Sequence, residues 1–234
     1  MAVIYLYDAN GNILWLTEAI HFDFEHYSRM AKEICVEEGD GLLVFNPETH
    51  AVRIINQDGT DGEFCGNGLQ AAAFHAGQSS MDLMMGGRLI QTMSEGHRVK
   101  ILLDANPGLP QRVEWRGVIA YALNMPNPHC VFINPPSEWQ LEKEGAACCI
   151  EWHTNVEWVR READFFEVSV YERGAGITAA CGSGALAVFT VLHALDQVRD
   201  RGKIKMQGGI LTVEAIGSKL SLQGHVRLLK SKVI

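Results

Sequence analysis

Two cysteines in matching surroundings are the residues of this sequence best suited to do chemistry. Residues 58–68 read DGTDGEFCGNG and residues 174–184 read GAGITAACGSG, so Cys65 and Cys181 each open a Cys-Gly-x-Gly motif before an apolar segment. A thiol at a helix N-terminus meets the positive end of the helix dipole and unpaired backbone N–H groups. Both lower the pKa of a cysteine, so we expect each thiol to serve as a base.

The backbone beside each thiol is suited to hold an anion. Glycine after the cysteine lets a ligand approach the main chain closely, and the N–H groups of Gly66, Asn67, Gly182 and Ser183 could hold a carboxylate. A small buried cysteine at a tight helix start explains one such motif equally well. Two copies in the same context favour a working pair instead. One thiolate would remove a proton from a carbon, and the other thiol would return one to the opposite face. This scheme requires no metal and no pyridoxal phosphate.

The elements that must position these thiols point to two related halves. The two cysteines stand almost half the chain length apart, so we expect two pseudo-symmetric lobes, residues 1–112 with Cys65 and residues 113–234 with Cys181. The chain ends could cross over between the lobes. Short runs of β-branched and aromatic residues recur throughout, while helical patterns are few, which predicts the α+β class. Helices are expected at 24–36, 66–75, 137–147 and 182–195.

Composition excludes several classes of protein. The 234 residues carry 20 Lys and Arg against 28 Asp and Glu, a formal net charge of −8, which argues against nucleic-acid binding and against a polybasic membrane surface. No apolar run reaches about 18 residues, and the N-terminal sequence lacks the pattern of a secretory signal. Six cysteines without a C-x-x-C pair indicate reduced thiols and give no support for a zinc site. We therefore expect a cytoplasmic protein.

The chain resembles the diaminopimelate epimerase family, a group of cofactor-independent two-cysteine amino-acid epimerases and racemases. The resemblance spans roughly Gly11 to Val226 and rests on motifs in the following order: NxDG (Asn56, Asp58, Gly59), CGNG (Cys65–Gly68), NPHC (Asn127–Cys130), ERGAG (Glu172–Gly176), ACGSG (Ala180–Gly184) and the Gly208–Gly209 turn. The resemblance implies a curved sheet or barrel around a central helix in each lobe. It also implies a small-molecule amino-acid partner, no cofactor, and either a monomer or a homodimer.

The resemblance also implies roles for individual residues. Cys65 and Cys181 match the two catalytic thiols, and His129 and Glu172 match polar groups beside the reacting carbon. The α-carboxylate would lie on the amides of Gly66, Asn67, Gly182 and Ser183. The far end of the substrate would be held by Asn12, Asn56, Asn127, Asn155 and Arg173.

Simpler explanations exist for several of these residues. Glu172 and Arg173 could form an ordinary ion pair at a strand end, and His129 could cap a loop after Pro128. The asparagines could all be turn residues.

Departures from the family pattern concern the substrate more than the chemistry. The usual G-x-G-N-D-F segment is replaced by Ala9–Leu14, and a glutamine gives way to Gly39-Asp40-Gly41. The expected function is conversion of LL- to meso-diaminopimelate, a step of lysine and peptidoglycan biosynthesis. The alternatives are a racemase of another amino acid, such as histidine or glutamate, an isomerase of the same fold acting on a different acid, and a non-catalytic protein that binds a carboxylate.

Overall fold

The computed structural model describes residues 3–62, 64–104 and 108–234, which divide into two compact units. The first unit comprises residues 1–102 and 223–234, and the second comprises residues 103–222. This division differs from the predicted boundary between residues 112 and 113. The end of the chain returns to the first unit because its last strand pairs with the first strand, from Val3↔Val233 to Ala9↔Val226.

The first unit is built mainly of antiparallel strands. Strand β1 pairs with β17 on one side and β2 on the other; β2 and β3 run parallel, and β6, β7 and β8 form a meander. The elements that contribute to this unit are β1 (Val3–Ala9), β2 (Asn12–Glu18), α1 (Phe24–Ile34), β3 (Gly41–Phe45), β4 (Val52–Asn56), β5 (Asp61–Gly62), α2 (Gly66–Ala76), β6 (Ser80–Met85), β7 (Arg88–Glu95), β8 (Arg98–Asp104) and β17 (Lys219–Val233).

The second unit has a related arrangement. Strands β9, β10 and β11 are antiparallel, β11 and β12 run parallel, and β13 lies between β12 and β15. Its elements are β9 (Gln111–Trp115), β10 (Val118–Asn124), β11 (Pro128–Ile133), a π-helix (Leu141–Gly145), α3 (Ala146–Trp152), β12 (Asn155–Arg161), β13 (Phe166–Glu172), β14 (Gly176–Thr178), α4 (Gly182–Ala194), β15 (Arg201–Met206) and β16 (Gly209–Ile216).

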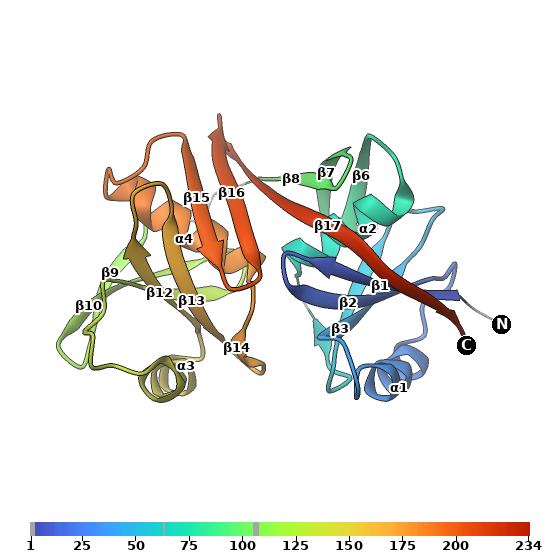
Figure 1. The fold of residues 1–234 in the computed structure, drawn as a ribbon, viewed down its shortest axis with the longest axis horizontal. Coiled ribbons are helices and arrows are strands. Elements are labelled where there is room, and N and C mark those ends of the chain that lie inside the picture. The colour runs from blue at the N-terminus through green and yellow to red at the C-terminus, as the bar shows by residue number, and fades with distance from the viewer. Residues whose placement is uncertain (1–2, 63, 105–107) are drawn as a thin grey trace. The chain divides into compact units, whose positions relative to one another are not determined.

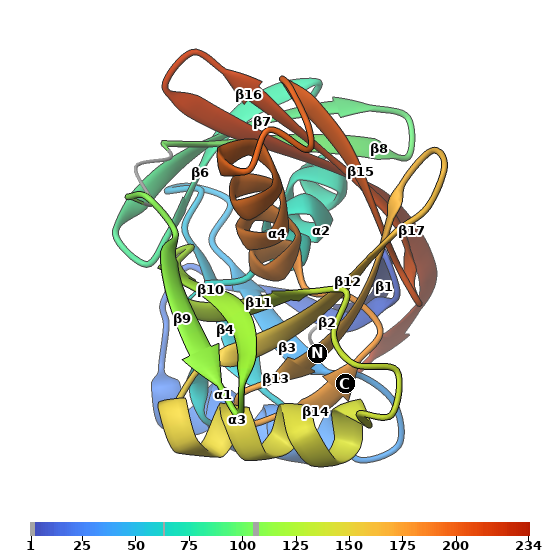
Figure 2. The same cartoon turned by 90° about the vertical axis from the view of Figure 1, so that its left-hand side faces the viewer.

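Each unit has one buried central helix. Helix α2 packs against β1, β2, β3, β4, β6 and β7, and helix α4 packs against β10, β11, β12, β15 and β16. Figure 1 and Figure 2 show α4 among the strands of its unit and α3 outside them. The sequence explains this placement, because α4 is apolar on nearly all sides and buries Leu186, Val188 and Phe189 completely or almost so. The predicted α+β class, with a curved sheet around a central helix in each lobe, is confirmed.

The helix expected at 137–147 is only partly confirmed. The chain instead forms a turn, a π-helix and then α3, which begins at Ala146. The backbone N–H of Trp139 donates to the carbonyl of Pro136 at 3.1 Å, and the indole packs edge-on against Trp115, with ring centroids 5.4 Å apart. The partly buried indole thus packs against the core from a turn that precedes the helix. No helix in the described part of the chain is long and apolar enough to cross a membrane.

Candidate active site

Cys65 is the residue that caps the N-terminus of α2. Its backbone is extended, with φ −139° and ψ 104°, and its sulfur accepts a hydrogen bond from the N–H of Gly68 at 3.2 Å. The N–H of Cys65 itself points to the sulfur of Met85 at 3.3 Å, and the amide oxygen of Asn12 lies 3.9 Å from the thiol. The side chain is half-buried. The thiol therefore acts as an N-cap, with its sulfur held against the first turn of the helix.

Cys181 caps α4 in the same way. Its φ and ψ are −130° and 110°, its sulfur accepts from the N–H of Gly184 at 3.3 Å, and its own N–H points to the sulfur of Met206 at 3.2 Å. The likeness of the two motifs thus extends beyond the Cys-Gly-x-Gly pattern to a methionine twenty or more residues downstream of each cysteine. A recurrence of this kind in both halves is expected for a repeated unit.

The four backbone amides predicted to bind a carboxylate lie in the first turns of these helices. Gly66 and Asn67 begin α2, and Gly182 and Ser183 begin α4; all four residues are buried. Amides at such positions have no partner within the helix and favour an anion. The amide oxygen of Asn67 also accepts from Asn10 at 3.1 Å, which fixes the first turn of α2 from the side.

A carboxylate and two hydroxyl groups lie around Cys181. The Glu172 carboxylate accepts hydrogen bonds from the Cys181 thiol and from the Thr178 hydroxyl, and the hydroxyl of Ser183 lies 3.4 Å from the sulfur. Burial raises the pKa of Glu172, and those two hydrogen bonds oppose the rise. The second unit therefore places a carboxyl group in direct contact with its thiol.

The sequence predicts a lowered pKa for Cys181, and this prediction is wrong. The helix N-terminus predicts a lowered value, but burial raises the pKa of Cys181 well above that of an ordinary thiol, and Glu172 and Glu157 raise it further. Only 4% of the residue is exposed. Desolvation and two neighbouring carboxylates outweigh the helix dipole here. Cys181 is thus a protonated thiol at neutral pH.

His129 lies in the same unit, buried on β11. Its Nδ1 is 2.6 Å from Oε1 of Glu157 on β12, and both side chains are fully buried. Glu157 was not among the predicted site residues. The available signal was a charged residue inside the apolar strand 155–159, where Val156, Trp158 and Val159 are all buried. A buried carboxylate in such a strand needs a partner, and His129 supplies it.

The asparagines predicted to hold the far end of a substrate have structural partners as well. The amide oxygen of Asn155 accepts from the backbone N–H of Arg173 at 2.9 Å, which fixes the exposed turn that carries this arginine. Asn127 lies in the turn between β10 and β11, where its carbonyl accepts from Met125 at 2.7 Å. Asn56 donates to the hydroxyl of Thr60 at 2.9 Å.

Asn12 is tied to the segment that departs from the family pattern. Its amide donates to Asp40 at 3.1 Å, and the same carboxylate accepts from the N–H of Ile13 at 2.7 Å. Burial raises the pKa of Asp40, while these two hydrogen bonds lower it. Asn12 thus links Asp40 to the Cys65 thiol.

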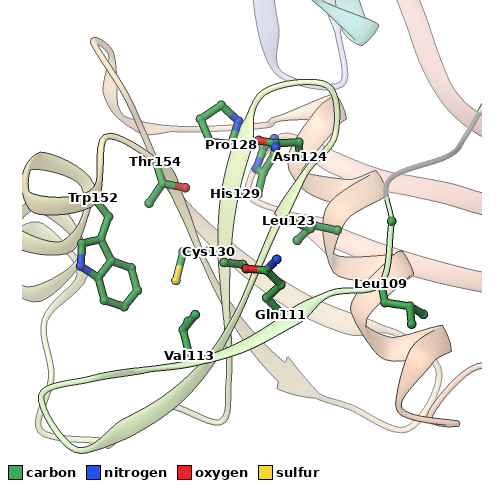
Figure 3. A pocket seen from close by; sticks show the side chains of 12 residues that line it. Leu109, Gln111, Val113, Leu123, Asn124, Pro128, His129, Cys130, Trp152 and Thr154 are labelled. Carbon is green, nitrogen blue, oxygen red and sulfur yellow. The ribbon is translucent and has the colours of Figure 1, made fainter.

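A cavity of about 550 Å³ adjoins the strand that carries His129. Figure 3 shows Asn124, Pro128 and His129 at one end of this pocket, and Trp152 and Val113 toward the other. The cavity lies within the second unit, between the β10–β11 turn and the end of α3. It combines apolar walls with a few polar groups, as small-molecule sites do.

Comparison with known proteins shows similarity to diaminopimelate epimerases. The family model described as diaminopimelate epimerase matches residues 121–228. A diaminopimelate epimerase of Carboxydothermus hydrogenoformans is 28% identical over 242 residues, covering 87% of this chain and 88% of the relative. Another, from Microcystis aeruginosa, is 29% identical over 215 residues, covering 74% of this chain and 75% of the relative.

Solved structures share the fold at low identity. A phenazine biosynthesis protein of the PhzF family from Enterococcus faecalis superposes with a TM-score of 0.77 at 15% identity, covering 98% of this chain and 97% of that one. A hydroxyproline epimerase from Agrobacterium vitis gives a TM-score of 0.67 at 11% identity, covering 99% and 91%. These likenesses establish the fold.

Proposed function

We propose that this chain, which is similar to diaminopimelate epimerases, is an isomerase that inverts the stereocentre of an α-amino acid without pyridoxal phosphate. The observation that carries the proposal is the pair of thiol-capped helices, one in each half of the chain. The substrate that we propose is LL-diaminopimelate, converted to the meso form in the cytoplasm.

In the proposed mechanism the two thiols exchange one proton each with the α-carbon. A thiolate takes the α-proton, so the C–H electron pair remains on the carbon and the base becomes a thiol. The second thiol then gives its proton to the opposite face and becomes the thiolate. The amides at the starts of α2 and α4 would hold the α-carboxylate, on which negative charge grows as the proton leaves.

The environment of each thiol suggests its form in the resting enzyme. Cys181, with its raised pKa, would be the protonated partner, and Cys65 would supply the thiolate. Glu172 is hydrogen-bonded to Cys181 and would accept or return its proton as the thiol changes state. His129, with Nδ1 already bonded to Glu157, would offer Nε2 to the substrate amine.

A racemase of a single-headed amino acid, such as histidine or glutamate, is the second candidate. Three of the asparagines already form hydrogen bonds within the protein: Asn12 with Asp40, Asn56 with Thr60, and Asn155 with the backbone of Arg173. The far amino-acid head of diaminopimelate needs several such donors and acceptors, together with a charge-assisted pair to Arg173. A shorter substrate would need fewer of them.

A racemisation screen in deuterated water tests the proposal. Diaminopimelate isomers, histidine, glutamate and the other standard amino acids are incubated with the enzyme and a reductant, and α-deuteration is read by mass spectrometry. The proposal expects deuterium at the α-carbon of diaminopimelate together with inversion. Exchange with another amino acid alone would favour the second candidate. If the protein binds a carboxylate but none of the tested amino acids gains deuterium, it is a non-catalytic binding protein.

A further inference from the structure

The buried side chains of His129 and Glu157 bond to each other, but each keeps one further polar atom that has no partner among the described residues. The Nδ1–Oε1 distance of 2.6 Å is that of a charge-assisted hydrogen bond, and neither side chain is exposed. Among the described residues, Nε2 of His129 and Oε2 of Glu157 have no hydrogen-bond partner. Buried polar atoms are rarely left unpaired, so an open nitrogen on a fully buried imidazole points to a ligand group that completes it.

The backbone of α4 is shaped to admit the Glu157 carboxylate. A Cβ added at Gly184 would lie 2.9 Å from Oε1 of Glu157, so only glycine lets the carboxylate approach the first turn of the helix this closely. A negative charge is favourable at that end of a helix. Gly184 also donates its N–H to the Cys181 sulfur. The same glycine thus holds the thiol by its N–H and leaves room for the carboxylate at its Cα.

Among the described residues of the first unit, a leucine takes the place of this acidic group. In the parallel pair β11–β12, His129 lies opposite Asn155, and Glu157 is two residues further along β12. In the parallel pair β2–β3, Leu14 lies opposite Gly41, and Leu43 is two residues further along β3. Leu43 also lies against Gly68, as Glu157 lies against Gly184. The scaffold therefore accepts a leucine at this position, and packing alone does not require a carboxylate there.

We propose that Glu157 is a positioning residue that holds the proton of His129 on Nδ1 and directs Nε2 to the amine of the substrate. The inference rests on the proposed function and adds to it a residue that acts only through the histidine. By accepting from Nδ1–H, the carboxylate fixes both the tautomer and the orientation of the ring. The lone pair of Nε2 then accepts a hydrogen bond from the α-ammonium group while the thiols exchange the α-proton.

A double-mutant cycle tests this role. Glu157→Gln keeps the size of the side chain but removes its charge, and we expect kcat to fall about 10- to 100-fold, as for other carboxylates that orient a functional histidine. In a His129→Asn background the same change should have almost no further effect, because Glu157 would have nothing left to position. Equal losses in both backgrounds would overturn the proposal. Glu144→Gln, which removes a carboxylate paired with Arg116 elsewhere in the same unit, is the matched control and should leave kcat unchanged.

Nuclear magnetic resonance of the imidazole gives a readout that needs no activity. In protein labelled with ¹⁵N-histidine, the signals of His129 are identified as those lost in His129→Asn. We expect a slowly exchanging proton on Nδ1, and we expect it to be lost in Glu157→Leu, a variant that copies Leu43 of the first unit. A proton on Nε2 alone in the native protein, or an unchanged Nδ1 signal in Glu157→Leu, would overturn the proposal.

The two readouts separate failure of this inference from failure of the proposed function. An enzyme that inverts an amino acid but shows additive losses in the cycle retains its function and refutes the role of Glu157. A protein that exchanges no amino acid refutes the proposed function, and with it any part of Glu157 in that reaction.

Discussion

The two thiol sites share a backbone but differ in what lies behind it. Cys65 and Cys181 have nearly the same φ and ψ, cap helices of the same kind and face a methionine sulfur through their N–H groups. The helix glycine three residues after each cysteine packs against Leu43 in the first unit and against Glu157 in the second. The repeat thus fixes the position of the sulfur, while the neighbouring strand decides its chemical surroundings.

This difference indicates a division of labour between the two halves. Burial raises the pKa of Cys181, Glu172 and Glu157 raise it further, and the hydrogen bond with Ser183 opposes the rise. Cys65 is more exposed and has an amide, that of Asn12, within 3.9 Å of its sulfur. A two-base reaction needs one thiol and one thiolate at the start of each turnover. In the proposed reaction Cys181 would be the thiol of that pair and Cys65 the thiolate.

The largest expected effect is the loss of either thiol. Cys65→Ala and Cys181→Ala should each lower the rate of inversion by about 10²- to 10⁴-fold, since each removes one of the two proton-transfer groups. Chiral chromatography of the product measures this loss, and circular dichroism checks that the fold is retained.

Each single variant should still eliminate a leaving group from a substrate analogue, because one base suffices for that reaction. Cys35→Ala and Cys148→Ala, at buried cysteines of the two units, are the controls. Full epimerisation by either thiol variant would refute the two-thiol scheme.

Glu172→Gln comes next and tests the acidic surroundings of Cys181. We expect kcat to fall about 10²-fold, because the group that exchanges a proton with the thiol is lost. Since Glu172 raises the pKa of Cys181, its neutral replacement lowers that pKa. The protonated thiol is then lost at a lower pH, so the alkaline limb of the pH–rate profile should move to lower pH.

Asp40→Asn is the matched change near the other thiol, since Asp40 accepts a hydrogen bond from Asn12, whose amide oxygen lies 3.9 Å from the Cys65 sulfur. It should have a much smaller effect on both kcat and the alkaline limb. Equal shifts in the two variants would contradict the division of labour.

The glycines of the two helices extend the comparison to stability. An added Cβ at Gly184 would meet a carboxylate oxygen of the buried pair at 2.9 Å, whereas at Gly68 it would meet a methyl group of Leu43 at 2.8 Å. A leucine methyl can move within an apolar core more easily than a hydrogen-bonded carboxylate. We expect Gly184→Ala to lower the free energy of unfolding by about 2–3 kcal/mol and Gly68→Ala by about 1 kcal/mol, the usual range for overpacking. Urea denaturation of the two variants measures both values, and the reverse order would contradict this account.

The sequence predicted the parts of this molecule that depend on local pattern. The apolar segments after Cys65 and Cys181 predict the two central helices, and the glycines after each cysteine predict their tight starts. The motif gave both thiols and Glu172, which the structure brings into contact with Cys181. Residues whose role depends on neighbouring strands were not found, and Glu157 is the main example. Its partner His129 stands on a parallel strand, with the whole of α3 between them in the chain.

The pKa of Cys181 was mispredicted for a related reason. A helix N-terminus is a local feature visible in the sequence, and it lowers the pKa of a thiol. Burial and the carboxylates of Glu157 and Glu172 are tertiary features, and they raise it by more. The exact boundary between the units also depended on tertiary pairing, although the return of the chain end to the first unit was among the expected arrangements. In each case the missing information was a contact between residues far apart in sequence.

The smallest effect concerns the reactivity of the two thiols in the free enzyme. Iodoacetamide reacts with thiolates, so a half-buried Cys65 should be alkylated at least about tenfold faster near neutral pH than Cys181, which is 4% exposed and has a raised pKa. The remaining cysteines are all buried, and burial raises the pKa of Cys35 to about 11. Peptide mass spectrometry after timed exposure measures each rate. In Glu172→Gln the rate at Cys181 should rise, because Glu172 raises the pKa of this thiol, and we expect the rate at Cys65 to stay the same. Faster labelling of Cys181 in the unmodified enzyme would mean that the helix dipole outweighs burial at this thiol, and would contradict its assignment as the protonated partner.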